Sequence, residues 1–299
     1  MKTDQIFMKK SIWFIINPNS GNRRKDDIAN LIYKHLDHLK FDYEIKYSAH
    51  KDDSYSISKT ALKKNIDIVC AVGGDGSVHD VGTAIIGSKT ALAIIPIGSG
   101  NGIARHMGIP LKVKQAILCI NDSFVIEMDT VLVNENYFLG FGGYGLDALI
   151  AKRFNEDKKR GLSNYIKHVL KEYFKYKPLN ICIHVNGQIK KENVIICTIA
   201  NTSEFGNGFI ISPKSVASDG IIELILIKPI LKWKIPFILY KFFNKHLDRS
   251  RFSEVISFKQ AKLNISDSIA QYDGETIEVK SEINIQVVPK SLNIIIKKR

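Results

Sequence analysis

Four short segments of this chain combine glycine with small polar or acidic residues, which are residue types that can bind phosphate or move a proton. They are Asn17-Pro18-Asn19-Ser20-Gly21, Gly73-Gly74-Asp75-Gly76-Ser77, Gly98-Ser99-Gly100-Asn101-Gly102 and Asp273-Gly274-Glu275. Successive backbone N–H groups in such turns can form a concave site for an anion. Glycine also lacks the Cβ that would block the approach of a ligand to the backbone. The first three segments therefore indicate phosphate binding, although none matches the GxxxxGK[ST] phosphate loop.

The fourth segment places two carboxylates on either side of a glycine. One carboxylate of such a pair can act as a general base on a hydroxyl, while the other positions a reactant or binds a metal. An Asp-Gly pair is more often a plain β-turn, and the same alternative applies to Asp219-Gly220. The turn alone leaves both interpretations open. The eight histidines, including His79, show no paired metal-ligand spacing.

The first three segments each follow an apolar run typical of a strand buried on both faces. These runs cover residues 12–16, 66–72 and 91–97, and a further strand is predicted over 43–47. Apolar residues at helical spacing predict a helix that covers the sheet, and they are Ile28, Leu31, Ile32, Leu36 and Leu39. Strands alternating with helices predict a mostly parallel sheet, whose ligands bind at the carboxyl ends of the strands. Three turns converging on that edge favour a nucleotide-phosphate site over ordinary strand–helix loops.

Near residue 129 the pattern changes to short β-rich segments. They cover 129–134, 136–142, 178–185, 188–199, 220–227, 255–265 and 276–297. Asn186-Gly187 predicts a two-residue hairpin turn, and helices are expected over 145–175 and 230–246. We therefore expect an α/β chain with two domains. Residues 1–128 form a nucleotide-binding domain with a parallel sheet, and residues 129–299 form a mostly antiparallel, β-sandwich-like domain.

Composition limits the class of protein. The chain has 299 residues, of which 45% are apolar and 24% charged, which is the composition of a globular protein and excludes a disordered or fibrous chain. Its four cysteines include no CxxC pair, which argues against a zinc site or a disulfide scaffold and favours a reducing cytoplasm. No apolar run is long enough for a signal peptide or for the ~18 residues of a transmembrane helix.

The net charge of +13 is concentrated in two windows, residues 151–180 at +6 and residues 228–262 at +7. Localised positive charge predicts an anionic partner, although a merely solvated basic face is an equal alternative. Residues 228–246 interleave lysines with aromatic residues, a pattern that suits the interface of an anionic membrane. A core helix whose lysines reach water would show the same pattern. A nucleic-acid partner is not expected, because neither window contains a recognisable binding module.

In their order along the chain, the four segments resemble the diacylglycerol kinase catalytic family, which includes soluble bacterial lipid kinases and sphingosine and ceramide kinases. GGDGS resembles the family's GGDGT signature, with Ser77 in place of threonine, and PIGSGNGIAR resembles its third loop. Further landmarks are Asp129, Asn134, Phe138, Gly142, Gly145-Leu146-Asp147, Asn201-Thr202, Gly206–Phe209, Pro213 and Asp219-Gly220. The resemblance spans residues 11 to 297. The GGDGS motif alone is shared with NAD kinases and phosphofructokinases, so the ordered set carries the specificity.

The resemblance implies an ATP-dependent and Mg²⁺-dependent transferase of lipid metabolism and phospholipid biosynthesis, which phosphorylates a lipid hydroxyl. It implies Asp273 as the general base, with Glu275 close by. It implies a structural Mg²⁺ bound by the Asp219 side chain and the carbonyls of Val216 and Ile221. The residues that it implies for nucleotide binding are Asn17, Pro18, Asn19, Ser20, Gly21, Ser48, Gly73, Gly74, Asp75, Gly76, Ser77, His79, Ser99 and Asn101.

Several alternatives stay open at this stage. Gly102 stands where many bacterial diacylglycerol kinases have Asp, which leaves diacylglycerol, a sphingoid base or a related lipid alcohol as the substrate, and ATP or GTP as the donor. An NAD-kinase-like enzyme acting on a soluble nucleotide is the alternative within enzymes, and a catalytically silent nucleotide- or lipid-binding regulator is the alternative outside them. We expect a cytoplasmic, peripherally membrane-associated protein. A homodimer is compatible with the sequence.

Overall fold

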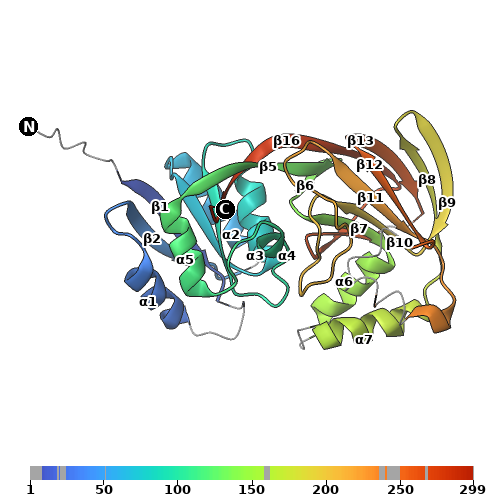
Figure 1. Ribbon diagram of the computed structural model, residues 1–299, viewed down its shortest axis with the longest axis horizontal. Coiled ribbons are helices and arrows are strands. Elements are labelled where there is room, and N and C mark those ends of the chain that lie inside the picture. Colours follow the sequence, from blue (N-terminus) through green and yellow to red (C-terminus); the bar gives the residue numbers. More distant parts are fainter. Residues whose placement is uncertain are drawn as a thin grey trace, which may run out of the picture. The chain divides into compact units, whose positions relative to one another are not determined.

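The computed structural model describes residues 9–18, 20, 25–50, 52–157, 162–235, 240, 250–266 and 269–298. Its contacts divide the chain into two compact units (Figure 1). Unit 1 contains the described residues of Met1–Gly98, Met107–Glu127 and Leu292–Arg299, and unit 2 those of Ser99–His106 and Met128–Ser291.

Unit 1 is a parallel sheet with helices. Its strands are β1 (Lys10–Ile16), β2 (Phe41–Tyr47), β3 (Ile68–Gly73) and β4 (Ala91–Pro96), in the order β2-β1-β3-β4. Its helices are α1 (Lys25–His35), α2 (Asp53–Lys63), α3 (Asp75–Ile85) and α5 (Val113–Asp122). Every residue of β3 and β4 is buried, which explains their uninterrupted apolar sequences. Ile28 and Ile32 of α1 pack into this core, whereas Leu39 lies beyond the helix and is 85% exposed.

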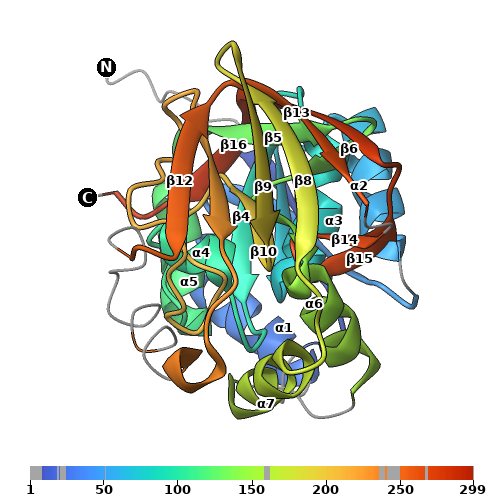
Figure 2. The same cartoon turned by 90° about the vertical axis from the view of Figure 1, so that its right-hand side faces the viewer.

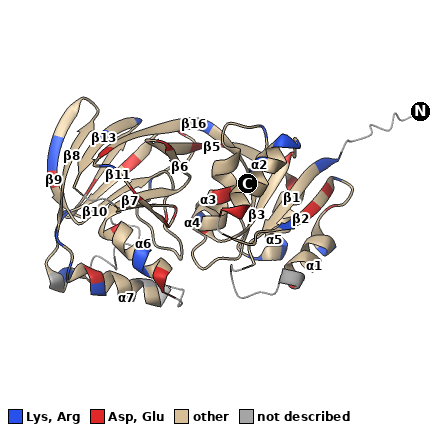
Figure 3. Cartoon of the chain, turned by 180° about the vertical axis from the view of Figure 1, so that it is seen from behind, with Lys and Arg blue, Asp and Glu red and all other residues tan. Residues whose placement is uncertain are grey.

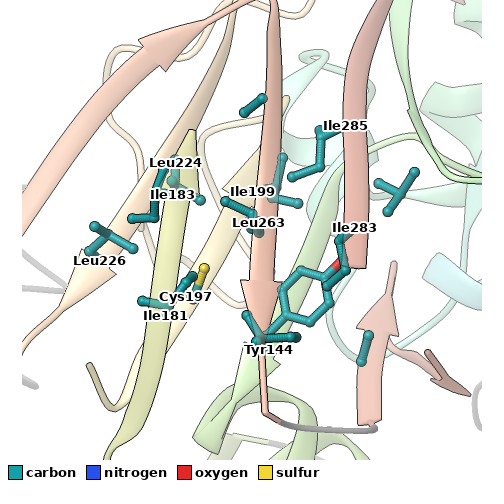
Figure 4. Packing of buried hydrophobic residues seen from close by; sticks show 14 of the residues in the cluster. Tyr144, Ile181, Ile183, Cys197, Ile199, Leu224, Leu226, Leu263, Ile283 and Ile285 are labelled. Carbon is teal, nitrogen blue, oxygen red and sulfur yellow. The ribbon is translucent and has the colours of Figure 1, made fainter. Parts of the chain in front are cut away.

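Unit 2 is an antiparallel β-sandwich. One sheet has the order β12 (Ser253–Phe258), β11 (Ile222–Ile227), β10 (Ile196–Ala200), β7 (Phe141–Gly145), β14 (Ile269–Tyr272), β15 (Glu275–Glu278). The other contains β16 (Glu282–Ile296), β13 (Gln260–Ile265), β8 (Leu179–Val185) and β9 (Gln188–Val194), and β5 (Phe124–Val133) pairs with β16 and with β6 (Asn136–Phe138). Alternating apolar residues of both sheets form the core, with Ile183, Ile199 and Leu263 inside it (Figure 4).

The predicted fold class is confirmed: a parallel-sheet unit and an antiparallel sandwich. The Asn186-Gly187 turn joins β8 and β9 and has positive φ at both residues, as a two-residue type I′ hairpin turn requires. The predicted helix over 145–175 is two helices, α6 (Leu146–Glu156) and α7 (Leu162–Tyr173). Within the predicted helix over 230–246, a 3-10 turn (η1) covers Lys232–Lys234, and residues 236–239 and 241–246 lie outside the described residues.

Two segments group with the opposite unit from the one in which a division at residue 128 would place them. Residues 292–299 group with unit 1, because Asn293 and Ile294 of β16 pair in parallel with Ala91 and Leu92 of β4. Residues 99–106, which include α4 (Gly102–His106), group with unit 2. In the part of the chain that the structure describes, no helix is long and apolar enough to span a bilayer.

Candidate functional site

The carboxyl edge of the unit 1 sheet carries the first two predicted loops. The Asn17 side chain donates from Nδ2 to Ser77 Oγ at 3.2 Å, and its backbone N–H donates to the Val72 carbonyl at 3.1 Å. The backbone N–H of Ser48, after β2, donates to the Ile16 carbonyl at 3.1 Å. The structure therefore brings Asn17, Ser48 and Ser77 to one edge. Asn19 and Gly21 lie outside the described residues.

The GGDGS segment turns from β3 into α3 with close packing around its first two glycines. A Cβ at Gly73 would lie 2.2 Å from Ser77 Oγ, and a Cβ at Gly74 would lie 3.3 Å from the Gly98 Cα. Gly74 is the N-cap of α3, so the N–H groups of the first helical turn begin at this loop. The helix start and its dipole favour an anion there. Asp75, Gly76 and His79 belong to the first turns of this helix.

The third predicted loop passes from unit 1 into unit 2. Ile97 donates its N–H to the Gly73 carbonyl at 2.9 Å, within unit 1. Ser99 and Asn101 instead belong to unit 2, where Asn101 has φ +54 and forms a β-bridge with Gly206. A Cβ at Gly206 would lie 2.8 Å from the Gly100 backbone, so this glycine permits the close approach. The loop is thus anchored to residues 204–207 by backbone packing.

His106 at the end of α4 strengthens that anchor, and sequence reasoning missed it. Its Nδ1 accepts the backbone N–H of Ser203 at 3.1 Å and lies 2.9 Å from the Ser203 hydroxyl. Burial lowers the pKa of His106 to about 4, so the ring is neutral at pH 7. Its place in unit 2 indicates a structural role for this histidine.

The Asp273 turn holds its carboxylate against the backbone of a neighbouring segment. Asp273 is buried, and its oxygens accept N–H groups from Leu139 at 2.8 Å, Gly140 at 2.7 Å and Phe141 at 3.0 Å. A Cβ at Gly140 would lie 3.1 Å from Asp273 Oδ1 and 3.2 Å from Thr202 Oγ1, so a larger residue at this position would crowd both oxygens. Glu275 begins β15 two residues further on and is half-buried. The predicted pair is therefore part of a fixed turn between β14 and β15.

A buried acid lies behind this turn. Asp147, in the first turn of α6, accepts hydrogen bonds from Gln271 Nε2 at 3.0 Å and Thr198 Oγ1 at 3.4 Å. Burial raises the pKa of the Asp147 carboxyl to about 6, although both hydrogen bonds act to lower it. The sequence marked Asp147 only as a landmark of the resemblance, and no pattern pointed to Gln271.

The predicted magnesium loop offers oxygen donors only. The Val216 carbonyl accepts the Ser218 N–H at 2.8 Å, and Asp219 Oδ1 accepts the Ile221 N–H at 2.9 Å. Burial raises the pKa of the nearby Glu223; a hydrogen bond from Ser215 opposes the rise, and the charge of Asp219 adds to it. Carbonyl and carboxylate oxygens of this kind suit Mg²⁺. Among the described residues, no group of three His, Cys, Asp or Glu side chains could hold a metal.

Two family models together cover nearly all of the chain. The diacylglycerol kinase catalytic domain matches residues 11–133, and the YegS C-terminal NAD kinase beta sandwich-like domain matches residues 141–296. The second match alone spans more than half of the sequence. The chain belongs to the protein family that joins a diacylglycerol kinase catalytic domain to a YegS-type C-terminal domain. It is therefore a member of a family of kinases, and the predicted resemblance is confirmed.

Curated relatives of the family agree with this assignment. A protein named diacylglycerol kinase from Mycobacterium tuberculosis is 28% identical over 70% of this chain and 71% of its own length. A protein named as a YegS-like lipid kinase from Klebsiella pneumoniae is 28% identical over 61% of this chain and 63% of its own length. The chain thus spans slightly less than two thirds of the Klebsiella protein.

Solved structures share the fold. Two crystal structures of diacylglycerol kinase-like proteins from Bacillus anthracis superimpose with TM-scores of 0.79 at 21% identity and 0.73 at 16% identity. Each alignment covers 96% of this chain and 97% of the other chain. At such identities the likeness shows the fold and not the substrate.

The predicted basic-aromatic segment exposes apolar side chains in its described part. Leu231 and Trp233 are 60% and 75% exposed, and Phe174, directly after α7, is 52% exposed. The Tyr173 hydroxyl donates to the Ile230 carbonyl and accepts the Ile230 N–H, which ties this segment to α7. Lys and Arg residues lie on α6 and α7 (Figure 3). Phe237, Phe242 and Phe243 lie outside the described residues.

Proposed function

We propose that this chain is an ATP-dependent lipid kinase, which transfers the γ-phosphate to the hydroxyl of diacylglycerol, a sphingoid base or a related lipid alcohol. The observation that carries the proposal is the buried Asp273 carboxylate. Three consecutive backbone N–H groups hold it in one orientation. A carboxylate fixed in this way suits a single proton transfer in a defined direction. The names of the relatives supply the class of acceptor.

Phosphoryl transfer depends mainly on position and on neutralising charge, with little covalent help from the protein. We assign the phosphates of ATP to Asn17 through Gly21, Ser48, Gly73 to Ser77 and His79, with Ser99 and Asn101 contributing from the third loop. Support for the first two loops comes from the Asn17–Ser77 hydrogen bond and from the helix start at Gly74. The backbone N–H groups there act as fixed donors.

Asp273 acts as the general base in this proposal. It takes the proton of the lipid hydroxyl as that oxygen forms a bond to the γ-phosphorus and the bond between this phosphorus and the β–γ bridging oxygen breaks, with ADP leaving. Glu275, two residues along the same turn, orients the hydroxyl. The three backbone donors keep the Asp273 carboxylate from rotating away.

We further assign a structural Mg²⁺ to the Asp219 side chain and the carbonyls of Val216 and Ile221, with water completing its shell. The oxygen-only donor set of this loop supports the site. When bound, Mg²⁺ supplies positive charge that offsets the carboxylates. Asp129 positions the loop, because its Oδ2 accepts the Gly220 N–H at 2.6 Å.

We also propose peripheral contact with an anionic membrane through Leu231, Trp233 and Phe174. Aromatic side chains at headgroup depth with Lys and Arg around them are the arrangement expected of an interfacial surface. Lys234 lies 4.8 Å above the Trp233 ring, so cation and ring are presented together. The free thiols of the four cysteines suit a reducing compartment such as the cytoplasm.

The test uses purified protein, Mg²⁺ and γ-labelled ATP with diacylglycerol, monoacylglycerol, sphingosine, ceramide or undecaprenol, each dispersed in vesicles. Soluble NAD is included as an acceptor, because the description of the second matched domain refers to the NAD kinase β-sandwich. We expect the native protein to transfer label to one of the lipids and the Asp273→Asn variant to transfer none to that lipid. Label in NAD alone would replace the proposal with the NAD-kinase-like alternative. Absence of label from every acceptor, with ATP still bound, would favour the silent regulator.

A further inference from the structure

Helix α6 carries a buried acid for which the proposed reaction has no role. Asp147 is 5% exposed, and a Cβ at Gly143 would lie 1.8 Å from its Oδ2, so the glycine of β7 makes room for the carboxylate. Burying a carboxylate is costly unless hydrogen bonds compensate. Its strongest hydrogen bond in the structure is to Gln271 of β14, two residues before Asp273. Figure 2 shows α6 below β14 and β15.

The hydrogen bonds of Gln271 fix the orientation of its amide. Its Oε1 accepts the backbone N–H of Gly274 at 2.7 Å, because a backbone N–H can only donate. Its Nε2 must then face Asp147, which accepts at 3.0 Å. The buried acid is therefore linked through one amide to the peptide that follows Asp273.

A second residue of α6 binds the next peptide group of the same turn. Asn155 donates from Nδ2 to the Gly274 carbonyl at 2.7 Å. The Gly274 N–H and C=O are thus both bonded to side chains, one through Gln271 and one directly to α6. Asp273 has φ +49 and Gly274 has φ +90. A non-glycine residue keeps a left-handed conformation only where its surroundings stabilise it.

We propose that Asp147, Gln271 and Asn155 are positioning residues, which hold the two peptide groups on either side of Gly274 and thereby set the conformation of the Asp273 turn. This inference rests on the proposed function, in which Asp273 is the base. Asp147 acts as the acceptor that orients Gln271, and Gln271 acts as the acceptor that orients Gly274. The chain of hydrogen bonds has one direction, so reversing a single member breaks it.

The test exchanges the amide of Gln271 and the carboxylate of Asp147 between the two positions. Gln271→Glu keeps the acceptor for Gly274 but places a second carboxylate against Asp147. Asp147→Asn with Gln271→Glu restores a donor between them and keeps one buried negative charge in total. At pH 8 we expect kcat to fall at least tenfold in Gln271→Glu and to return to within threefold of the native value in the double variant. The KM for ATP should stay within twofold in both, because the nucleotide loops of unit 1 are untouched.

Two further variants keep the test decisive if Gln271→Glu folds poorly. Asn155 is exposed, so Asn155→Asp removes its donor without disturbing the core, and kcat should again fall at least fivefold. Asn193→Asp is the matched control, because this exposed amide pairs with Asn180 on β8 and β9, away from the turn. It should leave kcat unchanged.

The proposal is overturned if Gln271→Glu and Asn155→Asp both keep native kcat, or if the double variant stays as slow as Gln271→Glu while equally well folded by circular dichroism. Asp273→Asn is measured beside them. If Asp273→Asn itself keeps native turnover, the assignment of the base fails, whereas loss of activity there with no rescue in the exchange pair refutes the positioning role alone.

Discussion

Asp147 makes the stability of the protein depend on pH in a direction opposite to that of most acids. Burial raises the pKa of this carboxyl from 3.8 to about 6. The unfolded chain therefore releases the proton at lower pH than the folded chain does. Between these two values the folded state binds more protons, so the free energy of unfolding falls as pH rises. Above the folded pKa the loss is complete and the contribution becomes constant.

The magnitude follows from the two pKa values. A shift of one unit corresponds to about 1.36 kcal/mol, so the titration of Asp147 lowers the free energy of unfolding, relative to its value at low pH, by about 1 kcal/mol at pH 4.5 and by about 3 kcal/mol at pH 7.5. Asp147→Asn cannot ionise. The free energy of unfolding of this variant, relative to the native protein, should therefore increase by about 2 kcal/mol between those two pH values.

Urea unfolding followed by circular dichroism, at both pH values and for both proteins, measures this difference. The comparison cancels the titration of every other group, because the two proteins differ only at residue 147. An identical difference in stability at pH 4.5 and pH 7.5 would refute the reasoning, since it would mean that Asp147 titrates equally in the folded and unfolded chains. A change of the opposite sign would show that the hydrogen bonds from Gln271 and Thr198 outweigh burial.

Three further predictions concern other parts of the molecule. Gly143→Ala places a Cβ 1.8 Å from Asp147 Oδ2 and should destabilise the protein by about 2 kcal/mol or more in thermal or urea unfolding; unchanged stability would contradict the packing described. Asp219→Asn should abolish the rise in melting temperature that Mg²⁺ gives the native protein, and an equal rise in both would place the metal elsewhere. In a Trp13→Phe background, Trp233 is the remaining tryptophan, and its emission should shift to the blue with anionic vesicles but not with neutral ones; no shift with either would remove the membrane contact.

The parallel-sheet unit was predictable because its local patterns and its structure agree. Apolar runs such as residues 12–16 and 91–97 can only be buried on both faces, and each is followed by glycine and small polar residues. The place of Gly74 against Gly98 follows from the parallel pairing of β3 and β4. The sandwich was predictable for a similar reason, since β-rich segments separated by turns such as Asn186-Gly187 form antiparallel sheets.

The parts that depend on distant pairs were not predictable. Gln271 and Asp147 meet only because β14 pairs with β7 and α6 packs on both, which joins residues 124 positions apart. Ser99 and Asn101 belong to unit 2 because Gly100 packs against Gly206, a contact that no local pattern indicates. The pairing of residues 293–294 with β4 was not predictable either, because an apolar strand pattern does not show which strand it will pair with.

The central claim is that Asp273 takes the proton from the lipid hydroxyl. The measurement is the single-turnover rate of phosphate transfer from ATP to the lipid acceptor in vesicles, for the native protein and for Asp273→Asn, with ATP binding measured on the same samples. General-base catalysis contributes about 10²- to 10⁴-fold. We therefore expect Asp273→Asn to react at least about a hundredfold more slowly with unchanged affinity for ATP. A rate within threefold of the native rate would contradict the account.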